Sequence, residues 1–212
     1  MTAHRSMIRR AAAVAAASAA AVVLAACGGG GDNSASGHNG HTPASSSAPS
    51  SAPAEEGAHN AADVAFAQGM IPHHRQAVEM ADLAETRAGS ADVKKLAAEI
   101  KKAQDPEIKT LSGWLASWGE DVPKDGEGGD HAGHSMSGMM TAEEMTELEK
   151  ASGKAFDTAF LEMMVKHHEG AVEMAKTEKA DGSYQPAKDM ADAIITSQSA
   201  EITRMNDLLG KN

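Results

Sequence analysis

One stretch of the sequence occurs twice, and this repeat constrains the fold more than any other feature. Residues 63–81 match residues 157–175 at eleven positions, with a constant offset (167 − 73 = 94) and no insertion. The same offset continues downstream, where the Gln-x2-Glu-Ile segment at 104–108 recurs. An unbroken register over some fifty residues indicates an internal duplication. The two halves are therefore expected to fold alike.

The repeated stretch predicts a helix with one buried face. Each residue of an α-helix advances by about 100°, and the shared Asp, Phe, Met, His and Ala positions then occupy an arc of about 120°, the width of one buried face. Glu79 points the opposite way, toward water. Both histidine pairs, 73–74 and 167–168, are therefore expected to face the interior.

Residues 60–211 predict an all-α, ferritin-like antiparallel four-helix bundle. Long helices are expected over about 60–87, 91–118, 153–180 and 186–209, and the capping-box pattern Thr141-Ala-Glu-Glu144 opens a short helix between them. No stretch shows the alternation of a strand. Two similar helix pairs with short turns predict two duplicated hairpins packed antiparallel. The segments are a first half at 60–118, a His/Met-rich linker at 119–141 and a second half at 142–211.

The first 59 residues are expected to lie outside this fold. Residues 1–26 combine arginines, a short apolar run and small residues before Cys27, which is the build of a secretory signal peptide. The Leu-Ala-Ala-Cys run resembles the lipobox of bacterial lipoproteins, which implies cleavage before Cys27 and lipidation of its thiol. A plain secretory signal with an incidental cysteine is the alternative. Residues 27–59 are rich in Gly, Ser, Ala and Pro and predict a disordered tether with solvated histidines.

Charge and cysteine content exclude several classes of protein. Without residues 1–26 the chain has 16 Lys and Arg (19 − 3) against 30 Asp and Glu, a formal charge of −14. That balance argues against binding to nucleic acid or to anionic lipid surfaces. Cys27 is the only cysteine, so no disulfide within the chain can form.

The duplicated histidines point to a metal site. Each pair has Met three or four residues before it and six or seven residues after it, and imidazole with thioether suits copper, Cu(I) in particular. The alternative is an ordinary core without metal, in which methionines fill gaps and the histidines are hydrogen-bonded to Gln and Glu. Glu and Gln on the apolar stripes of the second and fourth long helices are costly to bury without partners, so they are expected to orient the histidines. These residues are Gln104, Glu107, Gln198 and Glu201.

The linker between the halves carries further soft donors. It is either a solvated connection with oxidisable methionines or an arm that captures a soft metal, and the sequence leaves both interpretations open. The auxiliary metal-binding candidates are His131, His134, Met136, Met139 and Met140.

The two Phe-x3-Met-x2-His-His-x2-Ala-Val-Glu-Met-Ala blocks resemble the bacterial family known as domain of unknown function 305. The resemblance covers about residues 60–210. It implies a ferritin-like four-helix bundle in exported or lipid-anchored proteins, some of which are periplasmic copper-binding proteins linked to copper resistance. Carried over by position, the implied ligands are Met70, His73, His74, Met80, Met164, His167, His168 and Met174.

These observations favour a protein anchored through Cys27 at the extracytoplasmic face of the bacterial membrane. Its function is expected to be copper sequestration or handover to a copper-handling partner, with one Cu(I)-preferring site in each half and without catalysis. Two alternatives stay open. One is a metal-dependent oxidoreductase that uses the same ligands, and the other is a metal-free structural module of the envelope.

Replacing Cys27 by serine tests the anchor. Because the lipid is carried by the thiol, Cys27→Ser should release the protein from the membrane fraction or leave the signal peptide uncleaved. Cell fractionation and mass spectrometry of the N-terminal peptide distinguish the two results. The anchor is refuted if the processed variant stays with the membranes and carries no lipid.

Overall fold

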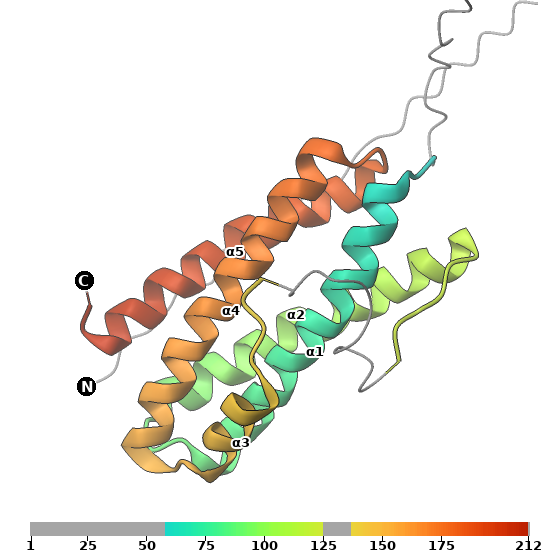
Figure 1. The fold of residues 1–212 in the computed structure, drawn as a ribbon. Coiled ribbons are helices and arrows are strands. Elements are labelled where there is room, and N and C mark those ends of the chain that lie inside the picture. The colour runs from blue at the N-terminus through green and yellow to red at the C-terminus, as the bar shows by residue number, and fades with distance from the viewer. Residues whose placement is uncertain (1–57, 125–136, 212) are drawn as a thin grey trace, which may run out of the picture. The chain divides into compact units, whose positions relative to one another are not determined.

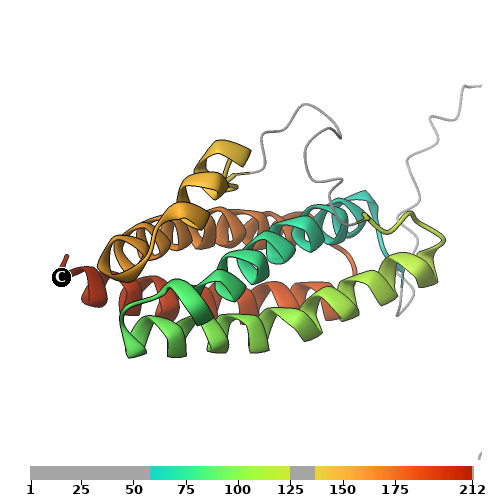
Figure 2. The ribbon, with the colours of Figure 1, turned by 90° about the horizontal axis from the view of Figure 1, so that it is seen from below.

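The computed structural model describes residues 58–124 and 137–211, which form five helices and no regular strand. Four long helices build the predicted bundle, and the short α3 packs against α1 and α4 (Figures 1 and 2). The fold class predicted from the sequence is confirmed. The helices are α1 (Ala61–Arg87), α2 (Ala91–Trp118), α3 (Ala142–Lys150), α4 (Gly153–Asp181) and α5 (Gln185–Leu209).

The helix ends follow the sequence signals. Thr141 and Glu144 form the predicted capping box of α3, and the Ser90 side chain accepts the Asp92 N–H at the start of α2. Gly119 ends α2 in the left-handed conformation (φ 76°), which glycine adopts without steric cost. The helix α1 continues through Pro72.

The two copies of the repeat pack against each other in antiparallel register. Ala88 at the end of α1 pairs with Gly153 at the start of α4, and His73 lies against His167. Residue numbers of facing positions thus add up to about 240 (88 and 153, 73 and 167). Since the copies are offset by 94, only position 73 meets its own counterpart, residue 167. A pseudo-twofold axis therefore passes between these two histidines.

The duplicated aspartates tie the two hairpins together. Asp63 of α1 accepts backbone N–H groups of Ser183 and Tyr184, at the turn into α5. Asp157 of α4 accepts the N–H groups of Gly89 and Ser90, at the turn into α2. Each copy thereby satisfies backbone donors in the turn of the other hairpin.

The core divides into two apolar clusters with a polar layer between them. On α1 one cluster ends at Ile71 and the other begins at Ala77, and the other three long helices show similar gaps. The six polar side chains in these gaps are almost completely buried. We call them the polar layer: His73, His74, Gln104, His167, His168 and Gln198.

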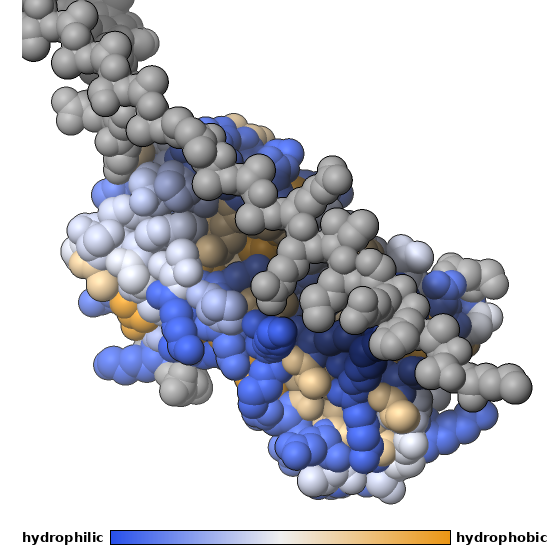
Figure 3. Space-filling model, turned by 180° about the vertical axis from the view of Figure 1, so that it is seen from behind, coloured by the Kyte–Doolittle hydropathy of each residue, from blue (hydrophilic) through white to orange (hydrophobic). Residues whose placement is uncertain are grey.

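The outer surface of the bundle is largely hydrophilic. Figure 3 shows smaller apolar areas among hydrophilic residues on one face. Among the described residues, Leu208 is the one large hydrophobic side chain that is exposed. None of the described helices has the length and apolar character needed to cross a membrane.

One histidine assigned to the tether is packed rather than solvated. The ring of His59 is partly buried and stacks on Trp118, with ring centroids 4.4 Å apart and planes 10° apart. Trp118 in turn contacts Tyr184 edge-on. The stacking partner lies far along the sequence, which is why the local composition around His59 did not reveal it.

A buried acid on α4 makes the stability of the bundle depend on pH. Glu178 is 1% exposed, and burial together with the neighbouring Asp63 raises its pKa to about 8. Burial alone would raise the pKa of Asp63 as well, but hydrogen bonds from Asn60, Glu178, Tyr184 and Ser183 hold it below its ordinary value. Asp63 therefore keeps its charge while Glu178 keeps a proton.

Glu178→Gln should remove part of this pH dependence. Between the ordinary pKa of 4.5 and about 8 the folded state retains a proton that the unfolded chain has lost. The Glu178 contribution to stability is therefore lost as pH rises through that window. We expect the variant to gain stability relative to wild type as pH rises from 5 to about 8, measured by urea unfolding. Glu85→Gln, at an exposed site on α1, is the control, and an equal gain there would contradict the assignment.

Candidate metal centre

Four histidines meet in the middle of the bundle, and all four are fully buried. Their inward direction follows from the apolar face of α1 and α4, as the sequence predicted. The rings of His73 and His167 lie across the interface between the two copies, with centroids 3.8 Å apart and planes at 44°. The sequence predicts one site in each half, whereas this contact brings one histidine of each half together.

The other two histidines each contact a glutamate of their own hairpin. His74 Nε2 lies 2.7 Å from Glu107 Oε2, and His168 Nε2 lies 2.6 Å from Glu201 Oε2. An ionised carboxylate can only accept a hydrogen bond, so Nε2 carries the proton, and in a neutral ring Nδ1 then keeps the lone pair. The pairing of these glutamates with the histidines agrees with the sequence prediction. Their effect on metal binding stays a prediction.

Burial keeps the central histidines neutral near pH 7. It lowers the pKa of His73 to about 3, with His74 lowering it further and the Ser137 carbonyl opposing the shift. Burial also lowers the pKa of His167 well below its ordinary value, and the neighbouring histidines act in the same direction. A metal-binding imidazole must be neutral, so both rings have the required protonation state.

The polar layer contains nitrogen atoms that make no hydrogen bond within the described residues. They are Nδ1 of all four histidines and Nε2 of His167. The Gln104 amide group and the Gln198 Oε1 atom also lack partners there. Buried polar groups in proteins nearly always have a partner. The unpaired lone pairs are thus compatible with a bound ion.

The described residues show no preformed site made of His, Cys, Asp and Glu donors alone. Within the described ranges, no group of three or more His, Cys, Asp or Glu side chains is arranged to hold a metal ion. An ion between His73 and His167 would therefore need a thioether or a low coordination number. The residues present fit a soft ion that accepts imidazole and methionine sulfur.

The predicted methionine ligands divide into two groups. Met70 and Met164 precede the histidines by three residues, about one helical turn, and border the polar layer. Met80 and Met174 follow the second histidine of each pair by six residues, about 9 Å along the helix axis. Met80 packs in one apolar cluster and Met174 packs against the other. The first two thioethers are thus better placed to reach an ion in the layer.

The linker candidates lie mostly outside the described residues. His131, His134 and Met136 fall in the range that the structure does not describe. Met139 is partly buried, and Met140 is buried in an apolar cluster. A role of these residues in metal binding stays a prediction.

Sequence reasoning missed the end of this linker. Residues 137–140, which we call the strap, lie against α1 and α4, and the Ser137 carbonyl contacts His73 Nε2 at 3.2 Å. A backbone carbonyl has no signature in the sequence. The one available signal was a difference between the copies, Gln76 in the first and Gly170 in the second.

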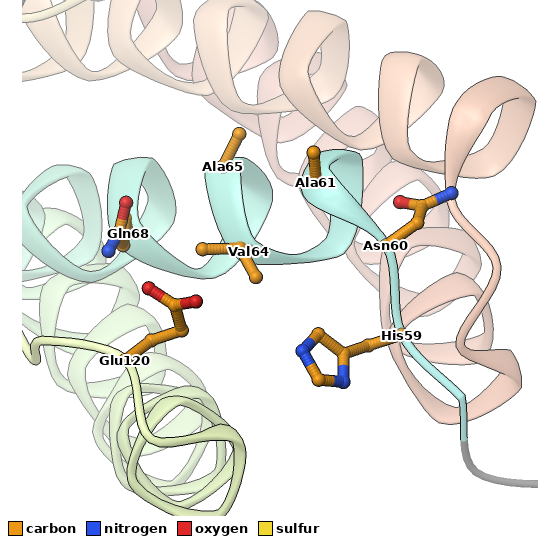
Figure 4. A pocket seen from close by; sticks show the side chains of 7 residues that line it. All are labelled: His59, Asn60, Ala61, Val64, Ala65, Gln68 and Glu120. Atoms are coloured by element: carbon orange, nitrogen blue, oxygen red, sulfur yellow. The ribbon is translucent and has the colours of Figure 1, made fainter.

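A surface pocket of about 400 Å³ lies at the start of α1 (Figure 4). Its lining contains one imidazole, His59, and one carboxylate, Glu120, but none of the four core histidines. Two such donors do not make a metal site by themselves.

The sequence matches the family model described as Domain of unknown function (DUF305) over residues 63–209. The chain belongs to this family. The match spans both copies of the repeat and every residue of the polar layer. No curated protein sequence matches the chain.

Several solved structures share the fold. A DUF305 protein from Streptomyces coelicolor is 34% identical, with a TM-score of 0.64, covering 71% of this chain and 91% of its own. CopM in its Cu(II)-bound form is 36% identical, with a TM-score of 0.60, covering 69% and 94%. CopM in its Cu(I)-bound form is 33% identical, with a TM-score of 0.57, covering 69% of this chain and 94% of its own. The bound copper ions are observations on CopM.

Glu201→Gln tests whether the glutamates orient the histidines toward a metal. A neutral amide accepts a weaker hydrogen bond from His168, so copper affinity should fall about ten- to a hundredfold while the helices stay folded. Competition with a Cu(I) chelator and circular dichroism measure the two quantities. Glu169→Gln, an exposed neighbour of His168, makes the same charge change and should leave affinity unchanged. Equal affinities of the two variants would refute the role.

Proposed function

We propose that this protein binds copper in the polar layer, at a centre shared between the two halves, and serves to sequester the ion or hand it on. The contact between His73 and His167 carries the proposal. Two buried, neutral imidazoles lie 3.8 Å apart between ring centroids, with unpaired Nδ1 atoms. Two lone pairs without protein partners in a fully buried layer are a strong reason to expect an ion there.

The donor chemistry supports Cu(I) over harder ions. The nearest carboxylates, Glu107 and Glu201, are already hydrogen-bonded to His74 and His168. The remaining donors are imidazole nitrogen and methionine sulfur, which suit copper and, with thioether, Cu(I) in particular. The copper-bound forms of CopM, which has a similar fold and sequence, give independent support.

The pseudo-twofold axis supports one shared centre rather than two separate ones. A pair of equivalent residues on the axis supplies one donor from each copy to the same ion. His74 and His168 lie beside this pair, each held by its own glutamate. They complete the surroundings of the ion whether or not they bind it directly.

Burial favours storage or transfer over turnover. All four histidines have zero solvent exposure, so a second reactant has no direct contact with them in this conformation. A metal-dependent oxidoreductase on the same ligands is the competing function. Turnover assays of the copper-loaded protein with oxygen, peroxide or cuprous ion separate the two.

The proposed setting is the extracytoplasmic face of the membrane. Lipidation at Cys27 would anchor the chain, and residues 27–59 would let the bundle reach a copper-handling partner. The His and Met residues of the linker would add a second, weaker place for the ion. This part of the proposal depends on the sequence alone.

His167→Ala tests the shared centre. If one ion is held by both copies, this single substitution should remove nearly all tightly bound Cu(I), because the donor set of the ion is broken. Competition with a chromogenic Cu(I) chelator gives the load, on untagged protein in which His131 and His134 are replaced by alanine to silence the linker.

His59→Ala, outside the polar layer, is the matched control and should keep the wild-type load. Retention of half the copper by His167→Ala would support one site in each half instead. Retention of the full load, or preference for Zn(II) over Cu(I), would overturn the proposal.

A further inference from the structure

The strap is fixed to both central helices at the level of the polar layer. On α1, the Gln76 side chain accepts the Met140 N–H at 2.7 Å and donates to the Met140 carbonyl at 2.9 Å. On α4, the Ser137 hydroxyl donates to Glu173 at 2.7 Å. Between these anchors, the Ser137 carbonyl lies 3.2 Å from His73 Nε2.

Two glycines allow the strap to approach this closely. A Cβ atom on Gly170 of α4 would lie 1.9 Å from the Ser137 carbonyl oxygen, which no real contact tolerates. Gly138 has φ +83°, and its Cβ would lie 2.5 Å from the Lys166 carbonyl oxygen. Any larger residue at either position would push the strap away from the helices.

The two copies of the repeat differ at the position that receives the strap. Three residues after the first histidine of each pair, the first copy has Gln76 and the second has Gly170 (170 − 94 = 76). Gln76 supplies the side chain that holds the strap, and Gly170 leaves the space that the strap occupies. The strap thus crosses the pseudo-twofold axis and makes the two sides of it different.

This difference reaches the histidines. A carbonyl oxygen only accepts hydrogen bonds, so its contact with His73 requires a proton on Nε2 and leaves the lone pair on Nδ1. Neither ring nitrogen of His167, the equivalent residue, has a hydrogen-bond partner in the strap, and the backbone group that opposes the fall in its pKa is that of His73. The strap therefore fixes the tautomer of one of the two central rings.

We propose that the strap is a positioning element of the centre, which commits His73 to Nδ1 as its donor and covers the outer side of the His73–His167 pair. Its consequence for copper rests on the proposed function, whereas its effect on the His73 tautomer does not. Displacement of the strap is then a step in the release of the ion.

Gly170→Ala is the direct test, because the added methyl group must displace Ser137. In the metal-free protein, ¹⁵N NMR of the histidine rings should show His73 as the Nε2–H tautomer in wild type and as a mixture in the variant. In the copper-loaded protein, transfer of Cu(I) to a chelator should be faster by about ten- to a hundredfold, the range seen when a ligand loses its orienting partner. The matched control is Gly113→Ala on α2, where a Cβ meets nothing within 4 Å.

Gln76→Ala provides a second test without a steric clash, in case Gly170→Ala fails to fold. It removes both bonds to Met140 and should shift the His73 tautomer and the transfer rate in the same direction by a smaller amount. A His73 tautomer equal to wild type in every folded variant would overturn the proposal, and so would transfer rates equal to that of Gly113→Ala. A wild-type protein that binds no copper would refute the proposed function instead, and the tautomer measurement would still decide the role of the strap.

Discussion

A layer of buried polar side chains crosses the middle of an otherwise apolar core, and the rest of the structure is built around it. Each buried polar group that lacks a partner costs about 1–3 kcal/mol, and aliphatic side chains in the same space would give a more stable bundle. The layer nevertheless occurs in both copies of the repeat, at His73 and His74 and again at His167 and His168. Binding of an ion by these side chains would offset the cost and explain why the core keeps them.

The duplication explains how few residues can build such a centre. Two homologous helices packed antiparallel bring one residue against its own counterpart, so a single histidine in the repeat supplies both members of the central pair. The same symmetry lets Asp63 and Asp157 cap the turns of the opposite hairpins. These caps fix the sliding position of α1 against α4, because a shift by one residue would break them. The register that they set is the one that places His73 on the axis.

The sequence could predict every feature that depends on helical periodicity and not those that depend on the partner of a helix. Hydrophobic spacing and capping residues predicted the helix ends to within a residue or two, and they predicted that the histidines face the core. The cost of burying a carboxylate without a partner predicted the pairing of Glu107 and Glu201 with histidines. The contact of His73 with His167 could not be predicted, because periodicity gives the face of a helix but not what lies opposite it. The strap stayed hidden since its decisive atom, the Ser137 carbonyl oxygen, is present in every residue type.

If the layer binds an ion, as proposed, the hydrogen bonds around it would determine which ions it selects. Glu107 and Glu201 hold Nε2 of His74 and His168, so an ion that required carboxylate oxygen would first have to break these two bonds. Each is a short bond to a charged group inside a protein, a kind typically worth about 1.5–3 kcal/mol. An ion that binds imidazole nitrogen and thioether sulfur leaves both bonds in place and gains from them, because a hydrogen-bonded N–H makes the opposite ring nitrogen more basic. In the proposed centre, preference for a soft ion would therefore arise as much from the partners that the carboxylates already have as from the methionines beside the histidines.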